Sequence, residues 1–185
     1  GNTIVLKPSE ITSGSAIELA RLAEEAGIPP GVINVVTGFR ETGEALVDHP
    51  LVAKVSFTGS VGAGRAIAAR AGQRLVSCML ELGGKSPNIV FADADLEKFA
   101  RESPYSVFDN AGQDCCARSR ILVERSVHDE VVERFAAATR KVVVGDPADD
   151  ATEVGTLVSA RQRDRVKDYI EIGLGEGAQL VVGVD

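Results

Sequence analysis

Short apolar segments rich in β-branched residues alternate with amphipathic segments along the first half of the chain. The apolar segments predict strands at residues 4–6, 32–36, 51–57, 75–82 and 88–91. The amphipathic segments predict helices at residues 13–26, 41–48 and 61–71. Strands that are apolar on both faces and alternate with helices are typical of parallel sheets covered on both sides. The pattern therefore predicts an α/β fold, with parallel sheets that carry helices on both faces.

Capping residues and prolines refine the ends of the predicted helices. Either Ser13 or Ser15 is expected to cap the start of the first helix, and Ser15 would open a capping box with Glu18. Asp95 is expected to cap a helix that Pro104 breaks, and Ser103 to cap a new one. The remaining pattern predicts a loop at residues 110–117, strands at 119–123 and 180–182, and a helix at 127–142. Ser159, three residues before Gln162, is expected to cap another helix.

The composition excludes several classes of partner. Acidic residues outnumber Lys and Arg by 27 to 20, which gives a net charge of −7, and aromatic residues make up 4% of the chain. A nucleic-acid partner is not expected, because phosphates need a basic face and bases need aromatic platforms. No apolar run is long enough to cross a bilayer and no signal segment opens the chain, so we expect a cytoplasmic protein with no membrane partner.

The three cysteines do not form a disulfide framework, since Cys115 and Cys116 are adjacent and Cys78 lies in an apolar segment. The sequence holds no Cys-x-x-Cys pair, and its two histidines lie far from the cysteines along the chain. No structural metal site is therefore predicted. Cys78 is expected to be a small buried apolar residue.

Three segments could carry chemistry. In the first, Phe57–Gly64, a predicted strand runs into a helix through glycines, where backbone N–H groups suit a phosphate. The glycine spacing differs from the usual dinucleotide fingerprint, and taken alone it favours a tight turn with Ser60 as the helix cap. In the second, Glu81 ends an apolar strand at the edge where parallel sheets bind ligands. It could act as a general base, or it could be a solvated strand end or form an ion pair with Lys85.

The third segment, residues 112–117, is a loop of small and polar residues around two thiols. A thiolate nucleophile needs positive potential, and a loop of small residues lets several backbone N–H groups converge on one atom. No histidine is close in sequence to act as its base, so a Cys–His pair is not predicted. For Cys115 alone, the ordinary alternative is a small buried apolar residue.

Taken together and in this order, four motifs resemble the aldehyde dehydrogenase superfamily over the whole chain. They are Leu6–Glu10, Phe57–Ser60, Leu80–Asn88 with Glu-Leu-Gly-Gly-Lys inside it, and Gly112–Cys115. The resemblance implies oxidation of an aldehyde substrate to a carboxylic acid with NAD(P). Cys115 would attack the aldehyde carbonyl while a backbone N–H holds the oxyanion. Glu81 would activate the water that hydrolyses the resulting thioester.

The resemblance also implies a cofactor site. Lys7 and Glu10 would contact the adenosine ribose, and the Glu10 carboxylate would repel a 2′-phosphate, which favours NAD over NADP. Gly59 and Ser60 would meet the pyrophosphate. The other residues of the expected cofactor site are Thr58 near the nicotinamide, Gly38 near the adenine, Gly64 and Leu82.

By the same resemblance, residues 1–82 would form the later part of a variant Rossmann-like NAD-binding domain, and residues 83–185 the first part of the catalytic domain. The family's side-chain oxyanion donor, an Asn, would lie before Gly1, and the glutamate that positions the nicotinamide ribose would lie after Asp185. A polypeptide of these residues alone is therefore expected to be inactive and poorly soluble. The whole protein would be a homodimer or homotetramer.

Two other functions stay open. A CoA-acylating relative would lack the general-base carboxylate, so Glu81 argues against it. A non-catalytic binding or structural fragment is the alternative from another class. The identity of the aldehyde is not predicted, although Asp114 before the nucleophile resembles the branch that acts on aminoaldehydes, where a carboxylate would attract a cationic substrate. Ala111 departs from the pattern, since many relatives have Gln there.

Overall fold

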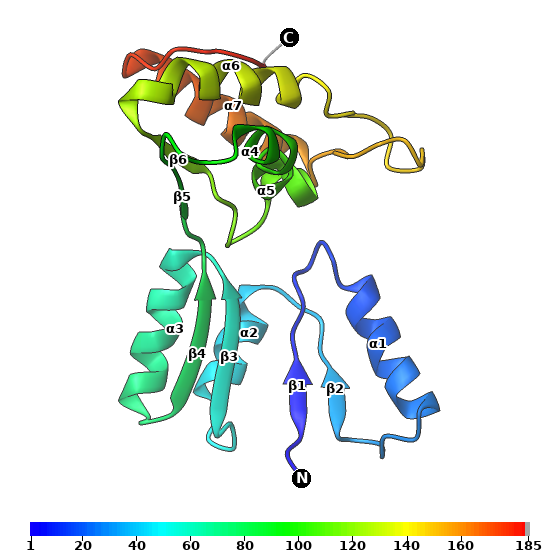
Figure 1. Ribbon diagram of the computed structural model, residues 1–185. Coiled ribbons are helices and arrows are strands. Elements are labelled where there is room, and N and C mark those ends of the chain that lie inside the picture. The colour runs from blue at the N-terminus through cyan, green and yellow to red at the C-terminus, as the bar shows by residue number, and fades with distance from the viewer. Residues whose placement is uncertain (184–185) are drawn as a thin grey trace. The chain divides into compact units, whose positions relative to one another are not determined.

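The computed structural model describes residues 1–183, which separate into an N-terminal unit, residues 1–82, and a C-terminal unit from Gly83 onward (Figure 1). The described residues form three sheets, and each sheet pairs two parallel strands that are joined through helices. The predicted α/β class is therefore confirmed.

The N-terminal unit contains two of these sheets. Strand β1 pairs with β2 and β3 pairs with β4, and the arrows of all four strands point in the same direction (Figure 1). Helix α1 contacts β2, α3 packs on β3 and β4, and α2 packs on α3. The elements are β1 (Ile4–Leu6), α1 (Gly14–Glu25), β2 (Ile33–Val35), α2 (Arg40–Asp48), β3 (Lys54–Gly59), α3 (Val61–Gln73) and β4 (Ser77–Leu82).

Packing in this unit depends on small apolar residues and on one arginine. Each of the three helices contributes a buried apolar side chain, namely Ala23, Val47 and Ala71. The Arg74 guanidinium donates to the backbone oxygens of Val47, His49 and Val52, which ties the end of α3 to the segment after α2. Along β4, exposed residues alternate with half-buried ones, so one face of this strand is open in the chain.

Two strands in this unit begin two or three residues later than predicted. The Val52 N–H donates to the His49 oxygen and closes a turn over residues 49–52, so β3 starts at Lys54. Leu75 ends α3 instead of beginning β4. Its N–H donates to the Gly72 oxygen and the N–H of Val76 donates to the Ala71 oxygen, which is a Schellman motif with Leu75 left-handed at φ 56°.

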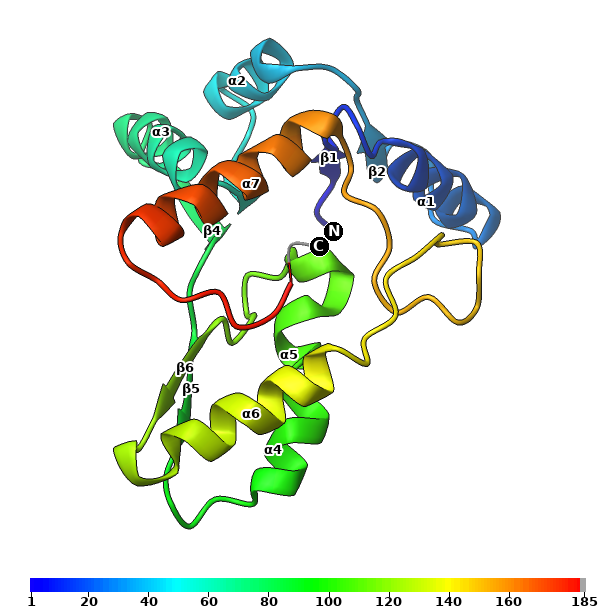
Figure 2. The same cartoon turned by 90° about the horizontal axis from the view of Figure 1, so that it is seen from above.

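The C-terminal unit contains one sheet and all the described helices that lie after residue 91. Helix α4 packs on α6 (Figure 2), and the ring of Phe135 lies between those of Phe99 and Phe108, with centroid distances of 6.1 and 6.3 Å. Val90 and Val131 are buried. The elements are β5 (Pro87–Val90), α4 (Leu96–Glu102), α5 (Tyr105–Phe108), the 3₁₀ turn η1 (Asp109–Gly112), β6 (Arg120–Val123), η2 (Arg125–Val127), α6 (His128–Thr139) and α7 (Ala160–Gly175).

The caps predicted at two helices are confirmed, because the Asp95 carboxylate accepts from the Lys98 N–H and the Ser159 hydroxyl accepts from the Gln162 N–H. For α1, Ser13 is the N-cap, which confirms one of the two residues expected there, and Ser15 lies inside the helix. The strand predicted at residues 180–182 is wrong, because these residues form no strand within the described part of the chain.

The break at Pro104 also differs from the expectation in detail. Proline separates α4 from α5, but Ser103 and Pro104 both keep right-handed helical backbone, so Ser103 does not open the second helix as an extended cap. The Ser103 hydroxyl instead accepts a hydrogen bond from the Asn88 side chain at 3.2 Å. Helix α6 spans His128–Thr139, three residues shorter at its end than predicted. Within residues 1–183, no helix has the length and apolar character that a membrane span requires.

Candidate active site

The register of β3 and β4 places two predicted site segments side by side. Thr58 lies opposite Glu81 and Gly59 opposite Leu82, at the carboxyl ends of two parallel strands. This edge is where open parallel sheets bind ligands. Thr58, Gly59 and Glu81 are exposed, so their polar atoms are accessible in this chain.

The start of α3 lies at the same edge. Ser60 has an extended backbone and its hydroxyl accepts from the Ala63 N–H at 3.2 Å, which makes it the N-cap of a 13-residue helix. The first N–H groups of a helix carry about half a positive charge. An anion at this edge would therefore meet the start of α3 next to Thr58 and Glu81.

Gly64 and Leu82 contact each other directly. A Cβ on the buried Gly64 would lie 2.6 Å from Leu82 Cδ2, so glycine allows α3 to lie close against the end of β4. A Cβ on Gly62 would meet no atom within 4 Å. Within this glycine-rich turn, Gly64 therefore serves packing, and Gly62 leaves open space beside the helix start.

Lys7 and Gly38 form a second group of predicted residues in the N-terminal unit. The half-buried Lys7 ammonium donates to the carbonyl oxygens of Pro8 and Gly38, each at 2.9 Å. Gly38 has φ 150°, and a Cβ there would overlap the Thr42 side chain at 2.1 Å, so only glycine fits. Glu10 is exposed in the turn that follows β1.

The loop that carries Cys115 begins with a left-handed turn. Asn110 and Ala111 have φ values of 52° and 55°, and Gly112 follows at 73°. Each left-handed residue other than glycine costs roughly 1–2 kcal/mol. The turn is braced by its own side chains, because the Asn110 amide donates to the Gln113 oxygen and the Gln113 amide donates to the Asn110 oxygen, both at 3.2 Å.

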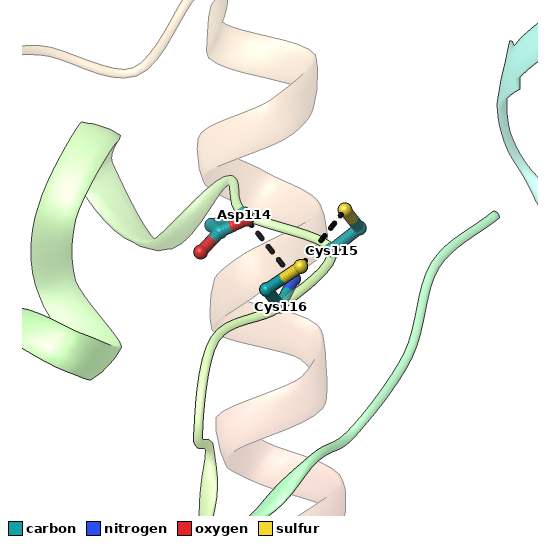
Figure 3. Close-up of side chains that lie close together, drawn as sticks. All are labelled: Asp114, Cys115 and Cys116. Atoms are coloured by element: carbon teal, nitrogen blue, oxygen red, sulfur yellow. Dashed lines mark hydrogen bonds between the residues drawn. The ribbon is translucent and has the colours of Figure 1, made fainter. Parts of the chain in front are cut away.

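Asp114, Cys115 and Cys116 cluster after this turn (Figure 3). The two sulfurs lie 3.7 Å apart, and the Cys116 N–H donates to the Asp114 carboxylate at 2.9 Å. Both thiol residues are exposed, so the alternative of a buried apolar residue is wrong for Cys115 in this chain. Cys78, by contrast, is half-buried in β4.

Gly84 is a residue of this site that the sequence reasoning missed. A Cβ on Gly84 would lie 3.1 Å from the backbone oxygen of Cys115, which is closer than side chains ordinarily come. The neighbouring Gly83 has no atom within 4 Å of such a Cβ. The double glycine of the Glu-Leu-Gly-Gly-Lys motif is the available signal, but by itself it indicates only a turn. In the structure, the absence of a side chain at Gly84 lets the backbone of Cys115 lie close to it.

Glu153 contacts α5, the helix that leads into the loop. The Glu153 carboxylate accepts from the Val143 N–H and from the Tyr105 hydroxyl, both at 2.9 Å. These bonds lower the pKa of Glu153, the backbone bond most, and the bond to the carboxylate raises the pKa of Tyr105. Tyr105 begins α5, so this contact fixes the start of the helix that leads to Cys115.

A hollow of about 360 Å³ in the C-terminal unit lies away from these residues. It is lined by apolar side chains of β6 and α6 and by residues 179–182, and no candidate site residue contributes to its lining. It therefore adds nothing to the chemistry of the cysteine loop.

Comparison with known proteins gives a consistent result. The family model described as aldehyde dehydrogenase family matches residues 1–185. The betaine aldehyde dehydrogenase of Brucella ovis is 49% identical over 183 residues, which cover 99% of this chain and 38% of that relative. A crystal structure of an NAD-dependent aldehyde dehydrogenase from Sinorhizobium meliloti superposes with a TM-score of 0.95 at 47% identity, covering 98% of this chain and 36% of that one. An indole-3-acetaldehyde dehydrogenase complexed with NAD⁺ gives a TM-score of 0.96 at 45% identity, covering 99% of this chain and 38% of that chain.

Proposed function

Because the chain belongs to the aldehyde dehydrogenase family, we propose that the protein carrying it oxidises an aldehyde to a carboxylic acid with NAD. The chain spans 38% of the length of the curated relatives it matches, so activity, substrate and partners are inferred for the protein that carries it. The observation that carries the proposal is the exposed thiol of Cys115 on a loop braced by its own side chains.

Cys115 is proposed as the nucleophile. Its thiolate sulfur bonds to the aldehyde carbon, and the carbonyl oxygen becomes an oxyanion that backbone N–H groups of the loop stabilise. NAD, when bound, supplies the acceptor for the hydride that leaves the aldehyde carbon. The acyl group is then held on the Cys115 sulfur as a thioester.

Glu81 is proposed as the base that takes a proton from water, so that the water oxygen attacks the thioester and frees the sulfur. Support comes from its exposed carboxylate at the carboxyl end of β4, opposite Thr58. A thioester without such a base would instead suit transfer to CoA, so the presence of this carboxylate favours hydrolysis.

The N-terminal unit is proposed to bind NAD and the C-terminal unit to supply the nucleophile. The residues present fit a dinucleotide, since Ser60 caps a helix start beside open space at Gly62, and this start suits the pyrophosphate. Thr58, Gly59, Gly64 and Leu82 would line the same turn. Lys7, Gly38 and the exposed Glu10 would take the adenosine end, where the Glu10 carboxylate would accept bonds from the ribose hydroxyls and disfavour NADP.

The substrate class is proposed to include cationic aldehydes, because the Asp114 carboxylate lies directly before the nucleophile. Relatives of 49% and 45% identity are named for betaine aldehyde and indole-3-acetaldehyde, so identity alone does not select one aldehyde. The proposed assembly is a homodimer or homotetramer of the whole protein.

The test compares two adjacent cysteines. In the protein that carries this sequence, Cys115→Ala should abolish NADH formation with every aldehyde, including a trimethylammonium aldehyde, whereas Cys116→Ala should keep most of it. Product analysis should find the free acid. Equal loss in both variants would mean that the nucleophile is wrongly assigned, and faster formation of acyl-CoA than of acid would replace hydrolysis with CoA transfer.

A further inference from the structure

We propose that Asp114, Cys115 and Cys116 form a binding site for a thiophilic divalent cation, with Zn²⁺ as the natural fit. One carboxylate oxygen and two sulfurs of these residues lie within 4.8 Å of one another, and all three residues are exposed (Figure 3). Zn²⁺ prefers sulfur, nitrogen and carboxylate ligands, whereas Mg²⁺ and Ca²⁺ take oxygen ligands.

The distance between the sulfurs suits this ion. In a tetrahedral site with Zn–S bonds of about 2.3 Å, two sulfurs lie about 3.8 Å apart. The sulfurs of Cys115 and Cys116 are 3.7 Å apart. The two thiols therefore already have the separation that a shared Zn²⁺ requires.

A disulfide between these cysteines fits less well. Its bond length is about 2.05 Å, and its Cα atoms usually lie about 4.4–6.8 Å apart. Adjacent residues across a trans peptide have Cα atoms only about 3.8 Å apart, and the chain has no cis peptide among its described residues. The geometry of the pair therefore favours a bridging ion over a covalent bond.

Asp114 supplies the third ligand and is held in place for it. Its carboxylate accepts the Cys116 N–H at 2.9 Å, and ligating carboxylates are commonly fixed by such bonds. Three protein ligands leave a fourth position for water. As the ion binds, each thiol forms a sulfur–metal bond and releases its proton to solvent, so two protons leave for one Zn²⁺ bound.

The consequence for activity rests on the proposed function, but the binding itself does not. If Cys115 is the nucleophile, its sulfur cannot bond to an aldehyde while it is bonded to the ion. Zn²⁺ would then inhibit the enzyme reversibly, and a chelator would restore it.

The binding test uses Co²⁺ in reduced, oxygen-free protein, because a cobalt–thiolate bond gives a charge-transfer absorption. Wild type should bind one ion with this absorption and release about two protons as both thiols become thiolate ligands. Cys116→Ser should weaken binding by about 100-fold, and Asp114→Asn by about tenfold with the absorption retained. The matched control Cys78→Ala removes a thiol outside the cluster and should change nothing.

Wild-type protein whose thiols all react with a thiol reagent, yet which gives no charge-transfer absorption, overturns the proposal. An equal loss of Co²⁺ affinity in Cys78→Ala and Cys116→Ser would also overturn the proposal. The activity measurement is separate: Zn²⁺ should inhibit wild type, and Cys116→Ser should need about 100-fold more for the same inhibition. If the protein binds Co²⁺ but oxidises no aldehyde, the metal site is supported and the proposed function is wrong. If the protein oxidises aldehydes but gives no charge-transfer absorption, the proposed function is supported and the metal site is wrong.

Discussion

At the carboxyl ends of β3 and β4, Thr58, Gly59, Glu81 and Leu82 are placed by strand register, whereas in the C-terminal unit Cys115 is placed by a loop. The register depends on backbone hydrogen bonds that a change of side chain leaves intact. The loop depends on a strained turn, on two amide side chains and on a close approach to Gly84. Substitutions of the exposed Thr58 and Glu81 should therefore alter chemistry alone, while substitutions around the loop should alter geometry.

The largest expected effect tests the first half of this comparison. Glu81→Gln keeps the shape and the strand position but removes the carboxylate proposed as the base, so deacylation should slow by about 10²–10⁴-fold. A burst of NADH close to the enzyme concentration should precede the slow steady state in stopped-flow measurements. A variant whose burst and steady state fall together would show that Glu81 acts before the thioester forms, or only through structure.

The next effect concerns the exposed turn after β1. Glu10→Ser removes a carboxylate that would bond the ribose hydroxyls and repel a 2′-phosphate, worth about 1–3 kcal/mol for a charged hydrogen-bond partner. The ratio of kcat/KM for NAD to that for NADP should fall by about 5–150-fold. Wild type that already prefers NADP would contradict this role, and Glu10→Gln should give an intermediate ratio because it keeps the shape and loses the charge.

The sequence predicts a structural feature well when the interactions that form it join residues close together along the chain. Asp95 and Ser159 were predictable as caps, because a capping bond joins residues three apart. The pattern assigns Leu75 wrongly to a strand, because an exposed apolar residue at a helix end resembles a strand start. The left-handed Ala111 gives no signal, since alanine rarely adopts that backbone.

Non-local geometry was also beyond the sequence. The pairing of Thr58 with Glu81 and the contact between Gly84 and Cys115 join segments far apart along the chain. The motifs indicated that these segments matter, but not which atoms meet. The stretch at residues 180–182 has the composition of a strand, yet a strand needs a neighbouring strand to pair with, and composition does not report one.

The third prediction tests the sensitivity of the loop. Gly84→Ala places a Cβ 3.1 Å from the Cys115 oxygen, so the loop must shift by a few tenths of an ångström. A shift of this kind should lower kcat by about tenfold and leave the KM for NAD unchanged. Gly83→Ala is the matched control, because its Cβ meets nothing within 4 Å and neither glycine has a left-handed φ. Equal kcat values for the two variants would show that the loop adapts freely.

The smallest expected effect compares left-handed residues in the two units. Three helices end in the same Schellman motif, with Gly27 at φ 88° and Gly177 at φ 91° in two of them and Leu75 at φ 56° in the third. Leu75 is 94% exposed, so replacing it with glycine loses little packing. Leu75→Gly should stabilise the protein by about 1 kcal/mol, because relief of roughly 1–2 kcal/mol of strain outweighs the added freedom of the unfolded chain.

Ala111→Gly relieves a similar strain, at φ 55°, but in the turn that leads to Cys115. Both variants should raise the midpoint of urea unfolding with an unchanged slope, and only Ala111→Gly should also lower kcat, because a freer turn holds the Cys115 thiol less firmly. If both variants gain stability and keep full activity, the strain at Ala111 has no part in placing Cys115, and the braces from Asn110 and Gln113 position the loop without it.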